Sequence, residues 1–314
     1  MKSKQIEDET RIFNTVYGAT YCRVGTRAAR WYCSCYQSTL KRLKKFANGR
    51  EVSFKQLTPE WLSQFERKLL ADQLKWNSIS TYMRTLRSVY NQAVERGIAS
   101  YIPRLFSRVH TGIDCQVKRA VSPEVICRLM TDKKPLPERL SFTRDMFVLL
   151  FLLRGMPFVD LAFLRKCDLQ GNVVVYHRHK TRRKLTVVVC PEAMAIIEKY
   201  KDMYPDSPYL LPIIQDSKQD EYRQYSKMLR LHNYRLRQVG YFLKIREQLS
   251  TYVARHTWAT TALRQNYNSS LICDAMGHSS VKVTETYFQR YREDEVNQLN
   301  NALVAFVLSK KVSY

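Results

Sequence analysis

The sequence predicts a mainly α-helical protein of two domains, a helical bundle followed by a larger α+β domain with a small β-sheet or hairpin. The chain has 314 residues, a length that suits two domains better than one. Apolar residues recur mostly at i, i+3 and i+4, and only 9 glycines and 10 prolines interrupt them. This periodicity breaks between residues 99 and 119, where we expect an interdomain linker. We therefore predict domains over residues 1–110 and 117–314.

Three amphipathic helices are expected in the first domain. The first runs roughly over residues 26–47, and Gly49 ends it. The second begins at Thr58-Pro59, an N-cap residue followed by proline at the first helical position. The third spans roughly residues 78–97, with Ile79, Tyr82 and Leu86 on its buried face.

The second domain combines helices with one β-rich region. Ser122-Pro123 repeats the cap-and-proline signature of a helix start. Residues 146–153 form the longest apolar run, which is far shorter than the roughly 20 residues of a membrane span and predicts a core helix. Residues 173–179 and 184–189 are β-rich and flank a basic turn, as in a hairpin. Residues 296–308 are expected to form an amphipathic tail helix.

The charge of the chain points to nucleic acid. Lysine and arginine number 52 against 28 acidic residues, a net charge of +24, and such an excess draws a protein to polyanions. A basic surface on a protein with another task is the alternative. We expect DNA contacts from exposed helix faces and from the tip of the hairpin, at Lys41, Lys44, Lys45, Arg84, Arg87, Arg182 and Arg183.

The compartment and cofactors follow from composition. The 8 cysteines lack zinc-ligand spacing and are typical of reduced thiols inside a cell. The polar N-terminus is unlike a signal peptide. We expect a cytoplasmic, nucleoid-associated protein that binds no membrane and needs no metal or other cofactor.

Two motifs and one tyrosine carry the chemistry. The chain reads Tyr-Val-Ala-Arg-His-Thr at residues 252–257 and Met-Gly-His-Ser-Ser at residues 276–280, and Tyr287 stands nine residues after His278. This order resembles the tyrosine recombinase (phage integrase) family, which has a His-x-x-Arg-His-Thr-like helix, a Leu-Gly-His-Ser-Ser-like turn and a nucleophilic tyrosine at that spacing. Three ordered motifs are a more specific signal than any one of them.

The resemblance implies a core-binding (SAM-like) bundle and an α+β catalytic domain that close together around duplex DNA. It makes Tyr287 the nucleophile, Arg255 a phosphate clamp and His278 a phosphate-binding or proton-relay residue. Lys180 on the hairpin would be the general acid that protonates the leaving 5′ oxygen. Arginine suits the clamp because its planar fork stays charged and binds two phosphate oxygens at once.

Two positions depart from the family pattern. Tyr252 stands where the family has histidine, on the helical face of Arg255, so its hydroxyl is expected to reach a phosphate without acting as a base at neutral pH. Alignment also puts Pro157 on the family's first arginine. We expect Arg154, three residues upstream, to be the displaced clamp; the alternative is an ordinary arginine at a helix C-terminus. His256 is expected to be structural.

The resemblance predicts a site-specific recombinase for DNA integration or inversion. About two dozen residues precede the first predicted helix, too few for an arm-binding domain, which favours an invertase or a mobile-element integrase acting on short inverted sites. A tetrameric synapse on DNA is expected, with a monomer or weak dimer in its absence. Two alternatives stay open: a catalytically impaired DNA-binding protein of the same fold, and a type IB topoisomerase-like nicking and closing enzyme.

Overall fold

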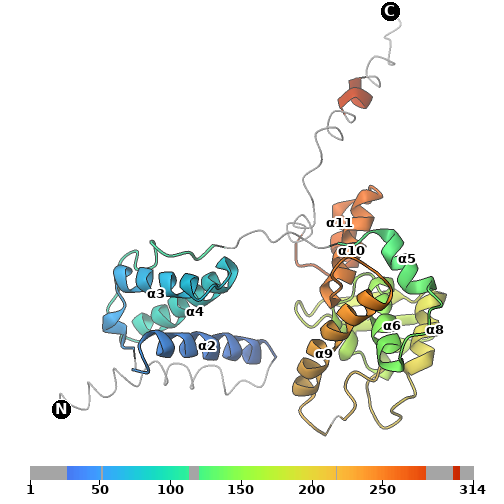
Figure 1. The fold of residues 1–314 in the computed structure, drawn as a ribbon, viewed down its shortest axis with the longest axis horizontal. Coiled ribbons are helices and arrows are strands. Elements are labelled where there is room, and N and C mark those ends of the chain that lie inside the picture. The colour runs from blue at the N-terminus through green and yellow to red at the C-terminus, as the bar shows by residue number, and fades with distance from the viewer. Residues whose placement is uncertain (1–26, 51, 113–119, 217, 281–299, 305–314) are drawn as a thin grey trace, which may run out of the picture. The chain divides into compact units, whose positions relative to one another are not determined.

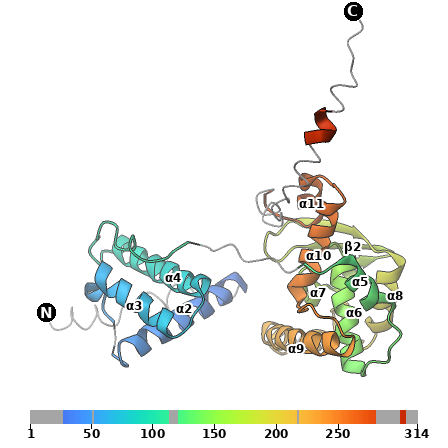
Figure 2. The same ribbon diagram turned by 45° about the horizontal axis from the view of Figure 1, so that its top comes forward.

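The computed structural model describes residues 27–50, 52–112, 120–216, 218–280 and 300–304. The chain divides into two compact units, Met1–Gln116 and Val117–Tyr314. Helices dominate both units, and the strands that the structure describes form one small sheet in the second (Figures 1 and 2).

The first unit is a helical bundle. Its helices are α2 (Arg27–Phe46), α3 (Pro59–Ala71) and α4 (Trp76–Glu95), with a short 3-10 turn η1 (Phe54–Gln56) between the first two. Gly49 follows α2 with a φ of +82° and donates its N–H to Lys44 O at 2.8 Å, so the predicted end of this helix is confirmed. The predicted start of α3 is confirmed as well, because Thr58 Oγ1 accepts the N–H of Trp61 at 3.1 Å.

The core of the first unit consists of apolar side chains from all three helices. Leu43 of α2, Phe65 of α3 and Leu86 of α4 are buried at its centre. Burying each large apolar side chain contributes about 1.5–3 kcal/mol relative to leaving it exposed. Tyr82, which the periodicity placed inside, is only half-buried at the edge of this core. Tyr90 holds the segment after α4, since its hydroxyl donates to Ser100 O at 2.6 Å.

The second unit surrounds one central helix. Its elements are α5 (Pro123–Thr131), α6 (Glu138–Leu152), α7 (Phe158–Ala162), η2 (Lys166–Asp168), β1 (Leu169–Gln170), β2 (Val173–His177), β3 (Lys184–Val188), α8 (Pro191–Tyr200), α9 (Glu221–Phe242), α10 (Thr251–Arg264) and α11 (Ser269–Ala275).

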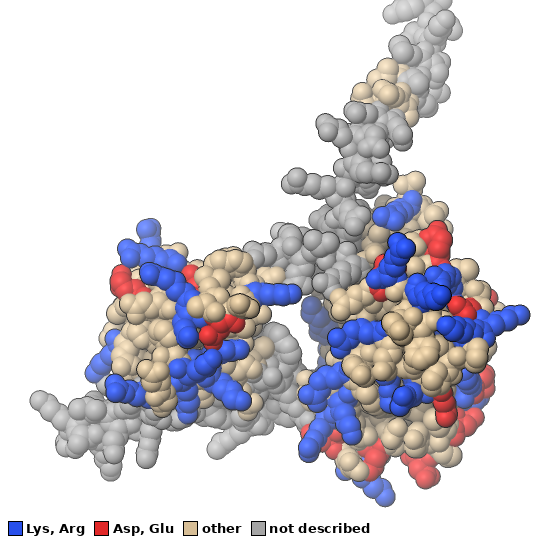
Figure 3. Space-filling model, in the orientation of Figure 1, with Lys and Arg blue, Asp and Glu red and all other residues tan. Residues whose placement is uncertain are grey.

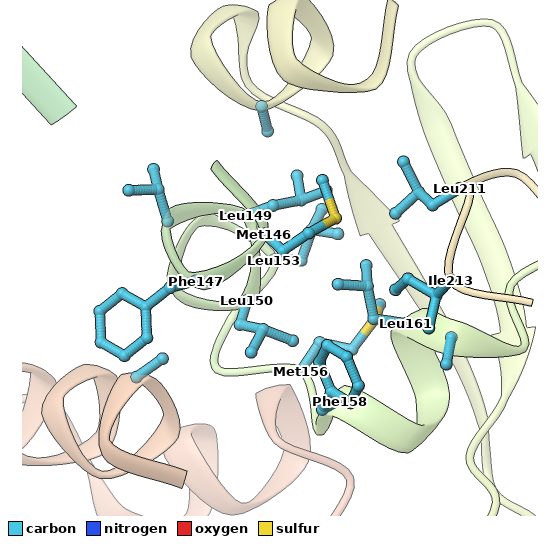
Figure 4. Packing of buried hydrophobic residues seen from close by; sticks show 14 of the residues in the cluster. Met146, Phe147, Leu149, Leu150, Leu153, Met156, Phe158, Leu161, Leu211 and Ile213 are labelled. Atoms are coloured by element: carbon cyan, nitrogen blue, oxygen red, sulfur yellow. The ribbon is translucent and has the colours of Figure 1, made fainter. Parts of the chain in front are cut away.

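Helix α6 is the core helix that the apolar run predicts. Its residues 146–150 are all buried, and a helix that is apolar on every side has to be covered on every side. Figure 4 shows Phe147 leaving α6 on the side opposite to Met146 and Leu149. Helices α5, α8, α9 and α10 all contact α6, which fixes α10 against the rest of the unit.

The sheet is a three-stranded antiparallel meander in the order β1-β2-β3. Tyr176 pairs with Leu185 and His177 with Lys184, so the predicted hairpin is confirmed, although β2 ends two residues earlier than expected. Beyond it the chain turns at residues 178–183, where Arg178 N–H donates to Arg183 O at 2.9 Å. No helix among the described residues is both long and apolar enough to cross a membrane.

Candidate active site

Arg255 on α10 is the centre of a buried polar cluster. Its side chain is only 1% exposed, although an arginine is almost never buried without partners. Nη1 donates to Gly155 O at 2.6 Å, and Nη2 donates to Met276 O at 2.9 Å and lies 2.7 Å from Nε2 of His278. The two carbonyls fix the plane of the guanidinium, while Nε has no hydrogen-bond partner within the described part of the chain.

The position of α10 is fixed by side chains from elsewhere in the unit. Ser250 is the N-cap residue, but its side chain makes no cap hydrogen bond. The amide of Thr251 donates instead to Asn233 Oδ1 of α9 at 2.9 Å. Thr257 Oγ1 accepts the N–H of Val121 at 3.0 Å, so the first described residues after the linker are bound to the helix that carries Arg255.

Gly155 allows α6 and α10 to approach closely. Its φ is +66°, and a Cβ there would lie 3.1 Å from Arg255 Cα and 3.3 Å from Trp258 Cβ. Any larger residue would therefore be strained by both its backbone and its neighbours. This contact puts the Gly155 carbonyl within reach of Arg255.

His278 is held by the end of α11. Gly277 has a φ of +62° and donates to Asp274 O at 3.0 Å, and His278 N–H donates to Cys273 O at 3.0 Å. These two hydrogen bonds form a Schellman cap, which explains the Gly-His pair in the motif. The cap turns the imidazole inward, where it is 4% exposed and contacts Arg255.

Arg178 is a second buried arginine, which the sequence analysis missed. It follows β2, is 6% exposed and donates through Nη1 to the carbonyl of Gly277. Burial lowers the pKa of Arg178, and the nearby charge of Arg255 lowers it further. Strand alternation was the available signal, because Val174, Tyr176 and Arg178 occupy every second position and all are buried.

Asp160 supplies the acidic partner of Arg178. It is buried on α7, just after Pro157, the residue that alignment puts on the family's first arginine. Its carboxylate lies 3.8 Å from Arg178 Nε, accepts the His179 N–H at 2.9 Å and lies 3.3 Å from His179 Nδ1. The guanidinium beside this carboxylate thus comes from the hairpin.

Arg154 lies at the junction between α6 and Gly155. Helix α6 ends at Leu152, and Arg154 has a left-handed φ of +58°. Its half-buried side chain donates through Nη1 to Thr186 O of β3 at 3.2 Å. Arg154 therefore satisfies a carbonyl of the strand at the edge of the sheet.

The other predicted catalytic residues lie around this cluster. Lys180 is exposed at the hairpin turn. Tyr252 is 57% exposed, and its ring centroid lies 5.0 Å from that of half-buried His256. The charge of a Tyr252 phenolate would raise the pKa of Arg178, so the hydroxyl lies within electrostatic reach of the cluster. Tyr287 lies outside the described residues.

The hairpin turn is tied to the α11 cap. Arg183 Nη2 pairs with Asp274 Oδ1 at 3.1 Å, and its Nη1 donates to His278 O at 3.5 Å. Arg183 is therefore engaged within the protein as well as exposed, whereas Arg182 is exposed with a φ of +59°. These contacts hold the turn that carries Lys180 against the turn that carries His278.

The predicted basic contacts of the first unit differ in their surroundings. Lys41 and Lys44 of α2 are exposed, but Lys45 pairs with Asp72 at 3.3 Å. On α4, Arg87 is exposed and Arg84 Nε donates to Ser80 O at 3.3 Å. Figure 3 shows lysine and arginine side chains over the visible face of both units.

Helix α9 carries a basic and aromatic stripe that the sequence analysis did not single out. Six of its exposed residues recur every three or four positions along one face, and each is basic or aromatic: Arg223, Lys227, Arg230, Tyr234, Arg237 and Tyr241. The Arg237 guanidinium lies 5.6 Å from the centroid of the Tyr234 ring. In Figure 3 basic side chains cover the part of the second unit where Figure 1 places α9. A stripe of this kind suits a nucleic-acid backbone.

Comparison with known proteins covers both units. The profile of the phage integrase SAM-like domain matches residues 23–107, and that of the phage integrase family matches residues 119–298. The chain matches the structure of the Tn1549 transposon integrase in complex with transposon right end DNA at 12% identity and a TM-score of 0.69, over 94% of this chain and 99% of that one.

Two structures of lambda integrase share the fold. Lambda integrase(75–356), as a dimer bound to a COC′ core site, matches at 12% identity and a TM-score of 0.62, over 93% of this chain and 96% of that one. Lambda integrase as a tetramer bound to a Holliday junction matches at 12% identity and a TM-score of 0.64, over 90% of this chain and 78% of that one. No curated protein matches the chain.

Proposed function

Since the chain belongs to the phage integrase family of tyrosine recombinases, we propose that it is a site-specific DNA recombinase that cleaves and rejoins strands through a 3′-phosphotyrosine at Tyr287. The observation that supports this proposal is the net positive charge of the buried cluster. Arg255 and Arg178 lie close enough for one charge to lower the pKa of the other, and Asp160 is the carboxylate beside them. Two guanidiniums against one carboxylate leave a net positive charge, which a scissile phosphate would compensate.

The reaction assigns one role to each group. The Tyr287 hydroxyl loses its proton to solvent through His278 as the proton relay, and its oxygen attacks phosphorus in line. A phosphorus–oxygen bond to tyrosine forms, and the bond to the 5′ oxygen breaks. Arg255 neutralises the non-bridging oxygens, with His278 beside it as a donor or proton relay. Lys180 gives the leaving 5′ oxygen its proton. Rejoining reverses these steps, and because the phosphotyrosine keeps the bond energy, no nucleotide cofactor is consumed.

Two arginines are candidates for the second clamp. Arg154 is the arginine that the sequence predicts, and its guanidinium donates a hydrogen bond to the carbonyl of Thr186 on β3. Arg178 is buried beside Arg255 and faces Asp160, the acidic residue that follows the Pro157 position. Burial in a site with little water strengthens its attraction to a phosphate, and this favours Arg178. Tyr252 is proposed to donate a hydrogen bond from the exposed edge of the site.

We propose that both units bind duplex DNA on short inverted sites of a mobile element, in the cytoplasm and at the nucleoid. The relatives with known structures were solved with transposon end DNA and with a core site. The exposed bases of α2 and α4 and the stripe on α9 would contact the phosphate backbone, which positions the protein without selecting a sequence.

We propose that the tail docks on a neighbouring copy to form a tetrameric synapse. The described turn at residues 300–304 is helical and exposes Leu303 and Val304. The second unit has a cavity of about 460 Å³ lined largely by apolar side chains, namely Phe151, Trp258, Ala262, Leu271 and Ile272. Deletion of residues 296–314 should leave single-site binding intact and abolish synapsis. Recombination at the wild-type rate by the truncated protein would refute this.

Trapping the covalent adduct tests the main proposal. The full-length protein is incubated with fragmented DNA from its source, adducts are recovered by denaturing precipitation, and the bound ends are sequenced. We expect protease-sensitive adducts at short inverted repeats, and none with Tyr287→Phe. Adducts without strand exchange on paired sites would indicate a nicking and closing enzyme. Sequence-selective binding with no adduct would indicate a catalytically impaired DNA-binding protein.

A further inference from the structure

Tyr176 lies on the inner face of the hairpin. Its side chain is 7% exposed, and the residues two positions before and after it, Val174 and Arg178, are buried as well. Its partner across the sheet is Leu185. A Cβ on Gly277 would lie 2.8 Å from Leu185 Cδ1 and 3.2 Å from Arg178 Cδ, so this face packs against the turn that holds His278.

The Tyr176 hydroxyl lies among the charges of the active site. Burial raises the pKa of Tyr176 and the charge of Asp160 raises it further, whereas Arg255, Arg178 and, less strongly, Arg154 lower it. All four charged groups are therefore within electrostatic reach. Within the described residues no group hydrogen-bonds to this hydroxyl, although the residue as a whole is only 7% exposed. The hydroxyl oxygen is not one of the fully buried atoms that lack a partner, so its donor is open to a ligand at the site.

The chemistry of this phenol suits a donor. Because its pKa is raised, the hydroxyl keeps its proton at neutral pH, so it can donate a hydrogen bond and cannot act as a base. A neutral donor also adds no repulsion to a site that already holds two guanidiniums. The scissile phosphate has two non-bridging oxygens, and each accepts several hydrogen bonds.

We propose that the Tyr176 hydroxyl donates a hydrogen bond to a non-bridging oxygen of the scissile phosphate, as a further, uncharged donor beside Arg255 and Arg178. This role rests on the proposed function; it differs from that of the nucleophile Tyr287, and Tyr176 would act from the inner face of the hairpin whereas Tyr252 lies at the exposed edge of the site. Tyr176 forms no covalent bond and transfers no proton. Its hydrogen bond strengthens as charge develops on the phosphate oxygens in the transition state.

Single-turnover cleavage by Tyr176→Phe is the first test. The adduct should form on the order of ten- to a hundredfold more slowly than with wild type, while DNA affinity changes by less than about twofold, because most contacts are to other phosphates. Tyr90→Phe is the matched control, since it removes a buried hydroxyl of the first unit that bonds to Ser100 O. Cleavage by Tyr90→Phe should match wild type. Equal rates for Tyr176→Phe and wild type would overturn the proposal.

Phosphorothioate substrates separate a direct contact from a positioning role. Sulfur is a weak acceptor, so replacing the contacted oxygen should slow wild type but add little to the slowing in Tyr176→Phe. The other diastereomer should slow both proteins equally. If both diastereomers slow Tyr176→Phe as much as wild type, the hydroxyl acts only through its neighbours and a direct contact is wrong.

A third measurement covers the case of a poorly folded variant. If the melting temperature of Tyr176→Phe falls far below that of wild type, 3-fluorotyrosine is placed at position 176, which keeps the hydroxyl and makes it a stronger donor. Cleavage should then be faster than with tyrosine, and an unchanged rate would overturn the proposal. Failure of the proposed function looks different: wild type itself would form no Tyr287 adduct.

Discussion

The two units treat polar groups in opposite ways. Among the described residues, the buried polar groups of the first unit are hydroxyls, such as those of Thr39, Ser80 and Tyr90, and no residue with a formal charge is buried there. The second buries the ionisable groups of Asp145, Asp160, Arg178, His232, Arg255 and His278. A charged group on the surface keeps its hydration and is screened by salt, whereas burying an unpaired charge destabilises the fold by several kcal/mol. The first unit is thus suited to binding, and the second to chemistry that needs charge away from water.

Removing Arg255 should have the largest effect. Arg255→Ala should slow cleavage by about a thousandfold, because a clamp on the developing charge is lost. The free energy of unfolding should fall by about 3 kcal/mol, because Gly155 O and Met276 O lose their donor. Single-turnover assays and urea unfolding measure the two effects. Arg255→Lys is the control: it keeps the charge without the fork, and full activity would show that the planar geometry is unimportant.

The second clamp is decided by comparing three arginines. Arg178→Ala should slow cleavage by about a hundredfold with a much smaller change in DNA affinity. Arg154→Ala should slow it less, because the Arg154 side chain is only half-buried and its attraction to a phosphate is weakened by nearby water. Arg165→Ala, outside the cluster, should have only a slight effect. A hundredfold loss in Arg154→Ala with little change in Arg178→Ala would return the role to the residue that the sequence predicts.

His232 should make the second unit sensitive to acid. It is fully buried on α9, stacked on Phe158 with 4.7 Å between ring centroids, and burial lowers its pKa to about 3. In the unfolded chain this histidine binds a proton near its ordinary pKa of about 6.5. Above that pH the contribution of His232 to the free energy of unfolding is therefore fully present. The free energy of unfolding should fall as the pH drops from about 6.5 towards 3, by about 1 kcal/mol per pH unit.

Urea unfolding at several pH values measures the effect of His232. The control, His232→Phe, keeps a ring against Phe158 without a titrating group, and its stability should depend less steeply on pH. An identical pH dependence in the two proteins would assign the acid sensitivity to other groups.

Surface charge of the first unit should affect binding alone. Replacing both Lys41 and Lys44 by alanine should weaken DNA binding severalfold and reduce the salt dependence by about 0.9 per lost phosphate contact. The cleavage rate at saturating DNA should not change. Lys45→Ala should have a smaller effect because Lys45 pairs with Asp72. A slower rate at saturation would mean that this unit also shapes the active site.

The sequence predicted what local rules determine. Helix boundaries follow from caps and periodicity, as Thr58 and Gly49 illustrate, and the hairpin follows from two β-rich runs. The contact between Arg255 and His278 was within reach of the sequence because motif and spacing carry it.

Contacts between distant segments were not predictable in this way. Arg178 meets Asp160 and Gly277 only because the hairpin folds against α7 and the end of α11, and no local pattern in the sequence states that proximity. The same holds for the cap that Asn233 gives to α10. The half-buried state of Tyr82 was not predictable because it depends on how far the neighbouring helices extend, which the sequence of its own helix does not determine.

The turn after β2 carries both Arg178 and Lys180, and Arg183 and Thr181 attach it to the α11 cap at His278 O and Gly277 O. If Arg178 is the second clamp, the position of this turn controls two catalytic groups at once. A shift of the hairpin moves the proton donor Lys180 and the phosphate clamp Arg178 away from the phosphate together. A protomer therefore either has both groups in place or lacks both. Single-turnover traces from a mixture of such protomers would show a reduced amplitude at an unchanged rate constant.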